Sequence, residues 1–300
     1  MSSAADGIAR DIGDLLRSLG VRRGDSLLVY SNAASIAKIV DVRKVHAEFG
    51  AGAREQLLLA FHRALRDCVG DGGTLMTLGS YTDYARYGKP FHVDKSLPDQ
   101  SLGAYPRFLF AQPGMVRSYN PTSNIIALGA RAADMAVRFN ATAYGWRTPW
   151  EKLIEHEAKL LFWDTTLRPM TFGHHVEQCV GVPHVYSKLY DTPIYDGDRE
   201  LPFKVITSVR YLTFNVKYNM ERLDAEAKAA GLVTMFSRNT LEVDLVECAP
   251  LARFLTEKLA VEPYYLLDGP PEFVPGVVPF DGNAGPEDQK IANVKYSSQR

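Results

Sequence analysis

Four short apolar runs, each about five residues long, constrain the fold of this chain more than any other feature. They occupy residues 26–30, 74–78, 125–129 and 159–163. Runs of this length next to turn residues or helical patterns are typical of buried strands. Amphipathic patterns at 5–19 and 54–69 predict helices between or before them. Partly alternating patterns at 186–195, 204–215 and 240–246 predict further strands. Alternation of strand and helix predicts an α/β protein whose helices pack on a βα-type sheet.

Length and composition narrow the class of protein further. The chain has 300 residues, 46% apolar, and a formal net charge of −1. We predict one α/β domain over residues 1–265 and a Pro/Gly-rich extension over 266–300 that is partly mobile, above all at 281–300. The low charge, without any basic run, argues against nucleic acid as a partner. No apolar run approaches the ~20 residues that span a bilayer, and no signal peptide is visible. We expect a cytoplasmic protein that binds no membrane.

The stretch from Thr171 to Glu177 contains the strongest candidate for chemistry. It follows the fourth apolar run, and Thr171 can cap a helix that begins there. His174 and Glu177 are three residues apart, so they share one helix face at contact distance. A carboxylate beside an imidazole fixes the tautomer and supports the ring as a base near neutral pH. We therefore predict His174 as a general base and Glu177 as its supporting carboxylate.

A purely structural pair of histidines and a zinc site are the other interpretations of this stretch. Adjacent histidines are often structural, and the spacing of His174, His175 and Glu177 does not match a zinc motif. No Cys-x-x-Cys pair supports a metal either, so no metal is predicted. The three cysteines (Cys68, Cys179 and Cys248) are expected to be buried, reduced thiols. Cys179 should point away from the face that holds His174 and Glu177, so it is not a predicted nucleophile.

Two further segments are candidate binding sites. Residues 31–35 (Ser-Asn-Ala-Ala-Ser) follow the first strand, and small residues there let a ligand approach backbone N–H groups. On this stretch alone, a simple tight turn is favoured. Residues 79–103 form a connection of about 25 residues that is rich in tyrosine, which predicts an ordered loop at a site. Its tyrosines can either stack on sugar faces or pack the loop onto the domain.

Several motifs together resemble those of the aminoglycoside 3-N-acetyltransferase family, including its branch that acts on amino sugars. The similarity extends in order over residues 10–190, and its strongest part is the Thr-x-x-His-x-x-Glu signature at 171–177. The other matching pieces are the first strand with its small-residue turn, Gly73-Thr74-Leu75, Gly88-x-Pro90-Phe91, Arg117-Ser118-x-Asn120-Pro121, Gly129, and Thr148-Pro149-x-x-x-Leu153.

The resemblance implies a mixed sheet flanked by helices, with an additional α/β portion toward the C-terminus, and acyl transfer from acetyl-CoA to an amine. It implies that the turn of Ser31, Asn32, Ala33, Ala34 and Ser35 holds CoA, and that His174 is the base and Glu177 its support. Backbone N–H groups of this turn, or a hydroxyl near Ser80, are then candidate donors to the tetrahedral oxyanion.

The sequence departs from the family pattern near the expected thioester site. Leu78-Gly79 stands where the family has Pro-Thr, so a hydroxyl expected there is missing, and Ser80 and Thr82 are the candidates to replace it. Asp164 stands where glycine is usual, and Met170 where asparagine is usual. The residues that we expect to bind the acceptor are Tyr81, Asp83, Asn120 and Thr171.

The predicted function is CoA-dependent transfer of an acyl group, in the first place acetyl, to a primary amine by direct attack. Acidic and basic residues balance in the 79–103 loop, so a singly charged amine of an amino sugar or sugar nucleotide is favoured over a polycationic drug. Two alternatives stay open: a natural-product acyltransferase with another acceptor, and a non-catalytic CoA-binding relative. The sequence also leaves open whether the chain forms a homo-oligomer.

Overall fold

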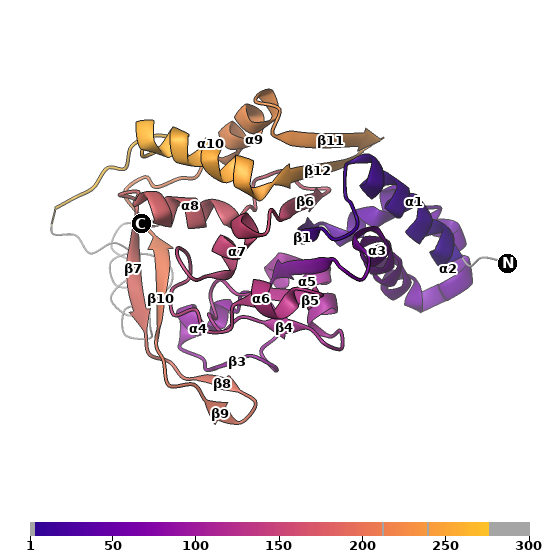
Figure 1. Cartoon of the computed structure of the whole chain (residues 1–300), viewed down its shortest axis with the longest axis horizontal. Helices are drawn as coiled ribbons and strands as arrows, with labels where there is room; N and C mark the ends of the chain where they lie inside the picture. The colour runs from indigo at the N-terminus through magenta and orange to yellow at the C-terminus, as the bar shows by residue number, and fades with distance from the viewer. Residues whose placement is uncertain (1–3, 212, 239, 276–300) are drawn as a thin grey trace, which may run out of the picture.

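The largest element of the computed structural model is a seven-stranded sheet (Figure 1). The structure describes residues 4–211, 213–238 and 240–275. From edge to edge the order is β11 (Val233–Arg238), β12 (Leu241–Glu247), β6 (Lys159–Trp163), β1 (Ser26–Ser31), β2 (Thr74–Leu78), β5 (Ile125–Gly129) and β4 (Val116–Arg117). β1 runs parallel to β2 and β6, and the other pairs are antiparallel. The expected mixed sheet is therefore confirmed.

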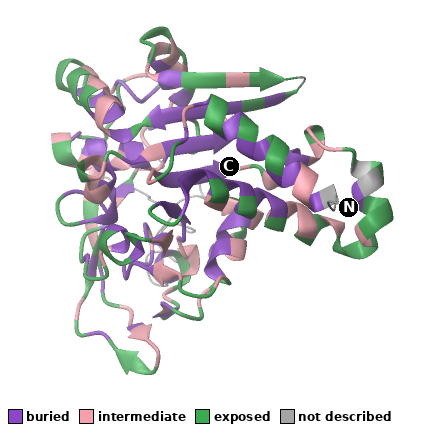
Figure 2. Cartoon of the chain, turned by 45° about the vertical axis from the view of Figure 1, so that its right-hand side comes forward, coloured by how far each residue is buried: buried purple, intermediate pink, exposed green. Residues whose placement is uncertain are grey.

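Helices cover both faces of the sheet because side chains alternate along its central strands. The helices are α1 (Ala4–Ser18), α2 (Val42–Phe49), α3 (Ala53–Val69), α5 (Ala104–Phe110), α6 (Ala132–Ala136), α7 (Pro149–Glu155), α8 (Phe172–Val180), α9 (Met220–Ala229) and α10 (Cys248–Val261). On β1, Leu27 and Val29 pack in one core with α1 and α3, whereas Leu28 and Tyr30 pack in the other with α7, α8 and α10. Figure 2 shows buried strands beneath helices whose outward sides are exposed. Within the described ranges, no helix has the length and apolarity needed to cross a membrane.

Smaller elements stand beside the main sheet. β7 (Val185–Tyr190) and β10 (Val205–Arg210) form an antiparallel ribbon next to α8 (Figure 1). β3 (Phe91–His92), β8 (Ile194–Asp196) and β9 (Arg199–Glu200) form a three-stranded sheet. The remaining short helices are α4 (Thr82–Tyr87) and the 3₁₀ segments η1 (Ala33–Lys38), η2 (Gly50–Gly52) and η3 (Gln100–Leu102).

Several predicted boundaries are wrong for identifiable reasons. The strand expected over 204–215 ends at Arg210, and Phe214 and Asn215 have left-handed φ angles of 60° and 61°, which a strand cannot contain. The strand expected over 186–195 is divided into β7 and β8 around Pro193, which has no N–H to donate to a ladder. Of the extension expected over 266–300, residues 276–300 lie outside the described residues.

The three parallel strands place the candidate site residues on one edge of the sheet. β1 leads into η1, β2 leads toward α4, and β6 leads through residues 164–171 into α8. The carboxyl ends of parallel strands meet at the same edge, which is where ligands bind in open α/β sheets. The fold therefore brings together the three segments that the sequence singled out separately.

Candidate active site

Helix α8 begins at the predicted position, but Thr171 does not cap it through its side chain. Thr171 precedes the first helical residue, Phe172, and makes no side-chain capping hydrogen bond. Its φ and ψ of −66° and −24° are already helical, whereas a capping residue usually has extended backbone. The side chain of Thr171 instead lines a cavity beside His174.

The predicted contact between the histidine and the glutamate is present on α8. His174 Nδ1 lies 2.6 Å from Glu177 Oε2, one helical turn further along. The rings of Tyr144 and Tyr218 flank His174, with centroids 5.7 Å and 5.4 Å from that of the histidine. The His174 side chain is 37% exposed and that of Glu177 is 1% exposed. The imidazole therefore reaches solvent while its carboxylate partner does not.

Glu177 is held by two further residues that lie outside α8 in the sequence. His184 Nε2 lies 2.8 Å from Glu177 Oε1, and the Tyr218 hydroxyl donates to both carboxylate oxygens at 2.9 Å and 3.0 Å. Burial alone would raise the pKa of Glu177, but the hydrogen bonds from His174 and His184 outweigh it and lower the pKa to about 2. Glu177 is thus a carboxylate that only accepts hydrogen bonds.

This network fixes the tautomers of both histidines. Because Glu177 only accepts, His174 donates through Nδ1 and a neutral ring keeps its lone pair on Nε2. His184 likewise donates through Nε2, and its buried Nδ1 has no partner in the described structure. His184 is fully buried and its Nε2 is bonded to Glu177, so its ring is closed to a ligand. His174 is left as the proton acceptor of the site.

Replacing the carboxylate tests this network. In Glu177→Gln, one acceptor oxygen becomes an NH₂ group that opposes the donors of His184 and Tyr218. We expect the free energy of unfolding at pH 7 to fall by about 2–4 kcal/mol. The pKa of Glu177 is lowered from 4.5 to about 2, so this stabilisation is complete above pH 4.5 and is lost as the pH falls through about 2.

Urea unfolding at neutral and acid pH measures the effect. The difference between the native protein and Glu177→Gln should narrow as the pH is lowered. The exposed Glu257 on α10 provides the matched control, since Glu257→Gln should change stability little at any pH. A difference that stays constant down to the acid limit would show that the charge of Glu177 is not what the network stabilises.

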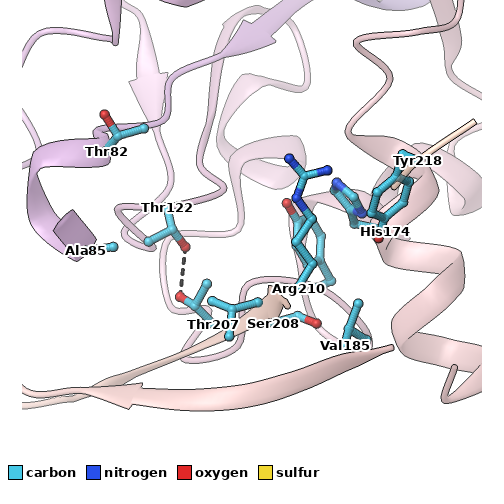
Figure 3. A pocket seen from close by; sticks show the side chains of 11 residues that line it. Thr82, Ala85, Thr122, His174, Val185, Thr207, Ser208, Arg210 and Tyr218 are labelled. Carbon is cyan, nitrogen blue, oxygen red and sulfur yellow. Dashed lines mark hydrogen bonds between the residues drawn. The ribbon is translucent and has the colours of Figure 1, made fainter. Parts of the chain in front are cut away.

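Two cavities meet at His174. Figure 3 shows the side chains that line the first of them. The first, of about 200 Å³, is lined by four hydroxyl side chains, those of Thr82, Thr122, Thr207 and Ser208. The second, of about 310 Å³, has a mixed lining, in which Met170, Met220 and Leu266 stand beside Arg168 and Thr171. His174, Arg210 and Tyr218 line both cavities. The open nitrogen of the histidine is therefore on a ring between two different binding spaces.

The predicted CoA-binding turn has a defined structure but lines neither of these cavities. Ser31 ends β1, and Ala33, Ala34 and Ser35 lie in η1. Ser35 is buried and its hydroxyl donates to the carbonyl of Asn32 at 2.7 Å. Asn32 Nδ2 donates to Asp164 Oδ2 at 3.1 Å. Asp164 precedes residues 168–174, most of which line the second cavity. The hydrogen bond between Asn32 and Asp164 therefore connects the turn at 31–35 to the wall of that cavity.

The predicted acceptor residues other than Thr171 also lie outside both linings. Tyr81 packs against Phe91, with ring centroids 5.9 Å apart. Asp83 accepts a hydrogen bond from Lys89 at 2.8 Å. Asn120 is fully buried, and its Oδ1 accepts hydrogen bonds from Thr122, which shapes the turn that carries Thr122 to the first cavity. Ser80 also lines neither cavity, whereas Thr82, its predicted alternative, lines the first.

Sequence reasoning missed several residues that surround His174. These are Tyr144, His184, Arg210 and Tyr218, which come from four segments of the chain. Residues 212–218 have no strong periodicity, and His184 lies beyond Gly181, where α8 has ended. No local pattern connects these residues to α8, because their proximity to it is produced only by tertiary packing.

The remaining sequence expectations concern cysteines and metals. Cys68 and Cys248 are buried as predicted, but Cys179 is exposed, which corrects the expectation of three buried thiols. Its Sγ lies 3.8 Å from His175 Nε2, on a different side of α8 from Glu177. His175 is itself buried and accepts a hydrogen bond from the Gly145 N–H at 3.2 Å. In the residues that the structure describes, no group of three or more His, Cys, Asp or Glu side chains could hold a metal.

The fold is that of solved aminoglycoside acetyltransferases. AAC-IIIb in its binary complex with CoASH matches with a TM-score of 0.70 and 22% identity, over 88% of this chain and 98% of that one. The aminoglycoside acetyltransferase AAC(3)-IIb matches with a TM-score of 0.68 and 23% identity, over 85% of this chain and 97% of that one. Sisomicin-bound AAC-VIa matches with a TM-score of 0.67 and 19% identity, over 84% and 97%.

Comparison by sequence leads to the same family. Residues 45–260, most of the chain, match the model of the aminoglycoside 3-N-acetyltransferase family, and the chain therefore belongs to that family. Aminoglycoside N(3)-acetyltransferase III of Serratia marcescens is 26% identical over 61% of this chain and 68% of its own length. Aminoglycoside N(3)-acetyltransferase VII of Streptomyces paromomycinus is 29% identical over 64% and 66%. The chain thus spans about two thirds of these relatives.

Proposed function

We propose that the protein transfers an acetyl group from acetyl-CoA to a primary amine, with His174 as general base and Glu177 as the residue that orients it. The observation that carries this proposal is the 2.6 Å contact from His174 Nδ1 to a buried carboxylate, which leaves Nε2 open between two cavities. Membership of the acetyltransferase family supports the proposal. Two structural relatives support it too, because AAC-IIIb is bound to CoASH and AAC-VIa to sisomicin.

The geometry suits direct transfer without a covalent enzyme intermediate. The amine nitrogen attacks the thioester carbon while its proton moves to Nε2 of His174. The C–S bond then breaks as the tetrahedral intermediate collapses, and the imidazolium returns the proton to the CoA thiolate. Glu177 stabilises the imidazolium that forms in between. Exposed Cys179 is not required, since no step needs a thiol of the protein.

Each cavity suits one of the two substrates. The second cavity, where Met170, Met220 and Leu266 stand beside polar groups, fits the acyl thioester and the adjoining pantetheine arm, which is itself part apolar and part amide. The first cavity, with its four hydroxyl groups, fits a sugar that carries the amine. The turn at residues 31–35 and the Ser80 segment lie on the same sheet edge and stay predictions for the rest of CoA and for oxyanion donors. We infer an amino sugar or sugar nucleotide as the acceptor.

Thermal unfolding with and without acetyl-CoA tests the donor. A ligand present at ~100 times its Kd stabilises the folded state by ~2.7 kcal/mol, which raises Tm by ~4 °C for a chain of this size. We expect such a rise with acetyl-CoA and with CoA, but not with AMP alone. Release of free thiol from acetyl-CoA upon addition of an amine then measures transfer. An unchanged Tm at millimolar acetyl-CoA would contradict the proposal.

A further inference from the structure

Neither cavity presents a carboxylate, because the described residues that line the first include an arginine but no aspartate or glutamate. The same is true of the second cavity, where Arg168 and Arg210 are the charged lining residues. A ligand with several ammonium groups would find no carboxylate to pair with in either lining. It would also bring its charges close to Arg210, which costs binding energy.

The nearest carboxylates do not change this charge balance. Glu177 lies behind His174 and already accepts hydrogen bonds from His174, His184 and Tyr218. Asp99 lies behind Thr82 and accepts hydrogen bonds from the hydroxyl of Thr82 and from the backbone and hydroxyl of Ser101. Both carboxylates are therefore occupied within the protein, and neither is presented to a ligand.

Arg210 is placed to meet a ligand anion beside the base. It is the last residue of β10, and its guanidinium carbon lies 5.1 Å from the centroid of the Tyr218 ring, which also packs against His174. No carboxylate of the described residues lies within ion-pair distance of it. Figure 3 shows the guanidinium group standing next to His174, across the cavity from Thr82 and Thr122. An exposed guanidinium with free N–H donors binds carboxylate or phosphate oxygens by paired hydrogen bonds.

We infer that the acceptor is an amine that also carries an anionic group, a carboxylate or a phosphate, and that Arg210 binds this group while His174 takes the proton from the amine. This inference rests on the proposed function and narrows its acceptor class. The phosphates of CoA are a poor alternative partner for Arg210, because the extended pantetheine arm separates them from the thioester, which must lie at His174 during transfer. The hydroxyls of Thr82, Thr122, Thr207 and Ser208 complete a site for a polar, anionic amino compound.

Matched pairs of amines test the inference. Calorimetry in the presence of CoA compares glucosamine with glucosamine 1-phosphate, glucosamine 6-phosphate and muramic acid, which add a phosphate or a carboxylate to the same amino sugar. Gentamicin serves as the polycation. We expect at least one anionic amine to bind ~10–100-fold more tightly than glucosamine, and gentamicin to bind more weakly than that amine. Equal or weaker binding of all three anionic amines, or no measurable binding of any of them, overturns the inference.

Variants of Arg210 connect the preference to this residue. Arg210→Met should abolish the preference for the anionic amine, and Arg210→Lys should retain part of it. Arg253→Met, at an exposed arginine on α10, is the matched control and should keep the preference. In turnover assays, Arg210→Met should raise KM for the anionic amine by a larger factor than KM for acetyl-CoA. If Arg210→Met lowers kcat equally for neutral and anionic amines, Arg210 acts on the reacting carbonyl and not on an anionic group of the acceptor. That result would overturn the inference.

The two proposals fail in distinguishable ways. An unchanged Tm with acetyl-CoA contradicts the acetyltransferase function, whatever the amines do. Stabilisation by acetyl-CoA together with transfer to glucosamine or gentamicin in preference to the anionic amines leaves the function intact and overturns only the acceptor class.

Discussion

His174→Ala is expected to lower kcat for amine acetylation by ~10²–10⁴-fold while acetyl-CoA still raises Tm. An amine becomes acidic as it attacks the thioester, and Nε2 of His174 is the proton acceptor that the Glu177 contact leaves open beside both cavities. Alanine removes that acceptor and leaves the other lining residues of the second cavity unchanged. Release of thiol from acetyl-CoA, measured with the best amine, gives kcat and KM for both proteins.

The control for this variant is a histidine far from the site. His46 is exposed on α2, at the opposite side of the molecule from α8 (Figure 1), and His46→Ala should leave kcat unchanged. Comparing kcat with the rise in Tm that acetyl-CoA produces separates a chemical role from a structural one. Loss of a base lowers kcat and leaves that rise in Tm in place. A variant with native kcat would remove His174 from the mechanism.

The sheet was predictable from sequence because its determinants are local. The runs at 26–30, 74–78, 125–129 and 159–163 are buried on both faces, so each is a continuous apolar segment that turn residues and helical patterns delimit. β11 was not predicted, since Met235 and most of its neighbours are exposed and no apolar alternation marks an edge strand. Edge elements take their structure from the strand that they pair with, in this case β12.

The same distinction between local and distant determinants applies to the site. His174 and Glu177 lie on one helix, so their contact follows from the helical repeat alone. His184, Arg210 and Tyr218 reach the same place from separate segments, and nothing in the sequence near them marks their role. The role of the small-residue turn at 31–35 stays a prediction. What the sequence could not indicate is that the side chain of Asn32 is bonded to that of Asp164, a residue with a left-handed φ of 52°.

Arg117→Met is expected to lower the free energy of unfolding by about 3 kcal/mol or more. Arg117 is 1% exposed and lies between the rings of Phe91 and Phe110, 4.6 Å and 5.0 Å from their centroids. It donates hydrogen bonds to Asn124 Oδ1 at 2.7 Å and to backbone carbonyl groups of the 79–103 segment, those of Gly79, Val93 and Ser96. Methionine keeps the contacts with the rings but leaves buried carbonyl groups without a donor. Urea unfolding measures the loss.

Burying the charge of Arg117 costs free energy, and the hydrogen bonds that Arg117 donates offset this cost. The sign of the stability change in Arg117→Met therefore depends on how much the lost hydrogen bonds contribute. Desolvation lowers the pKa of Arg117 to about 9, and removing the charge would relieve that cost. Each buried carbonyl that loses its donor costs about 1–3 kcal/mol, and several such losses exceed the relief. Arg117→Lys supplies a single nitrogen, which cannot reach all the carbonyl groups that the three guanidinium nitrogens reach in different directions. Lysine should therefore retain only part of the stability that methionine loses. Arg253→Met should cost less than about 0.5 kcal/mol. If Arg117→Met lost as little stability as Arg253→Met, aromatic packing and not Arg117 would hold the 79–103 segment in place. This segment is the one that carries Thr82 into the first cavity.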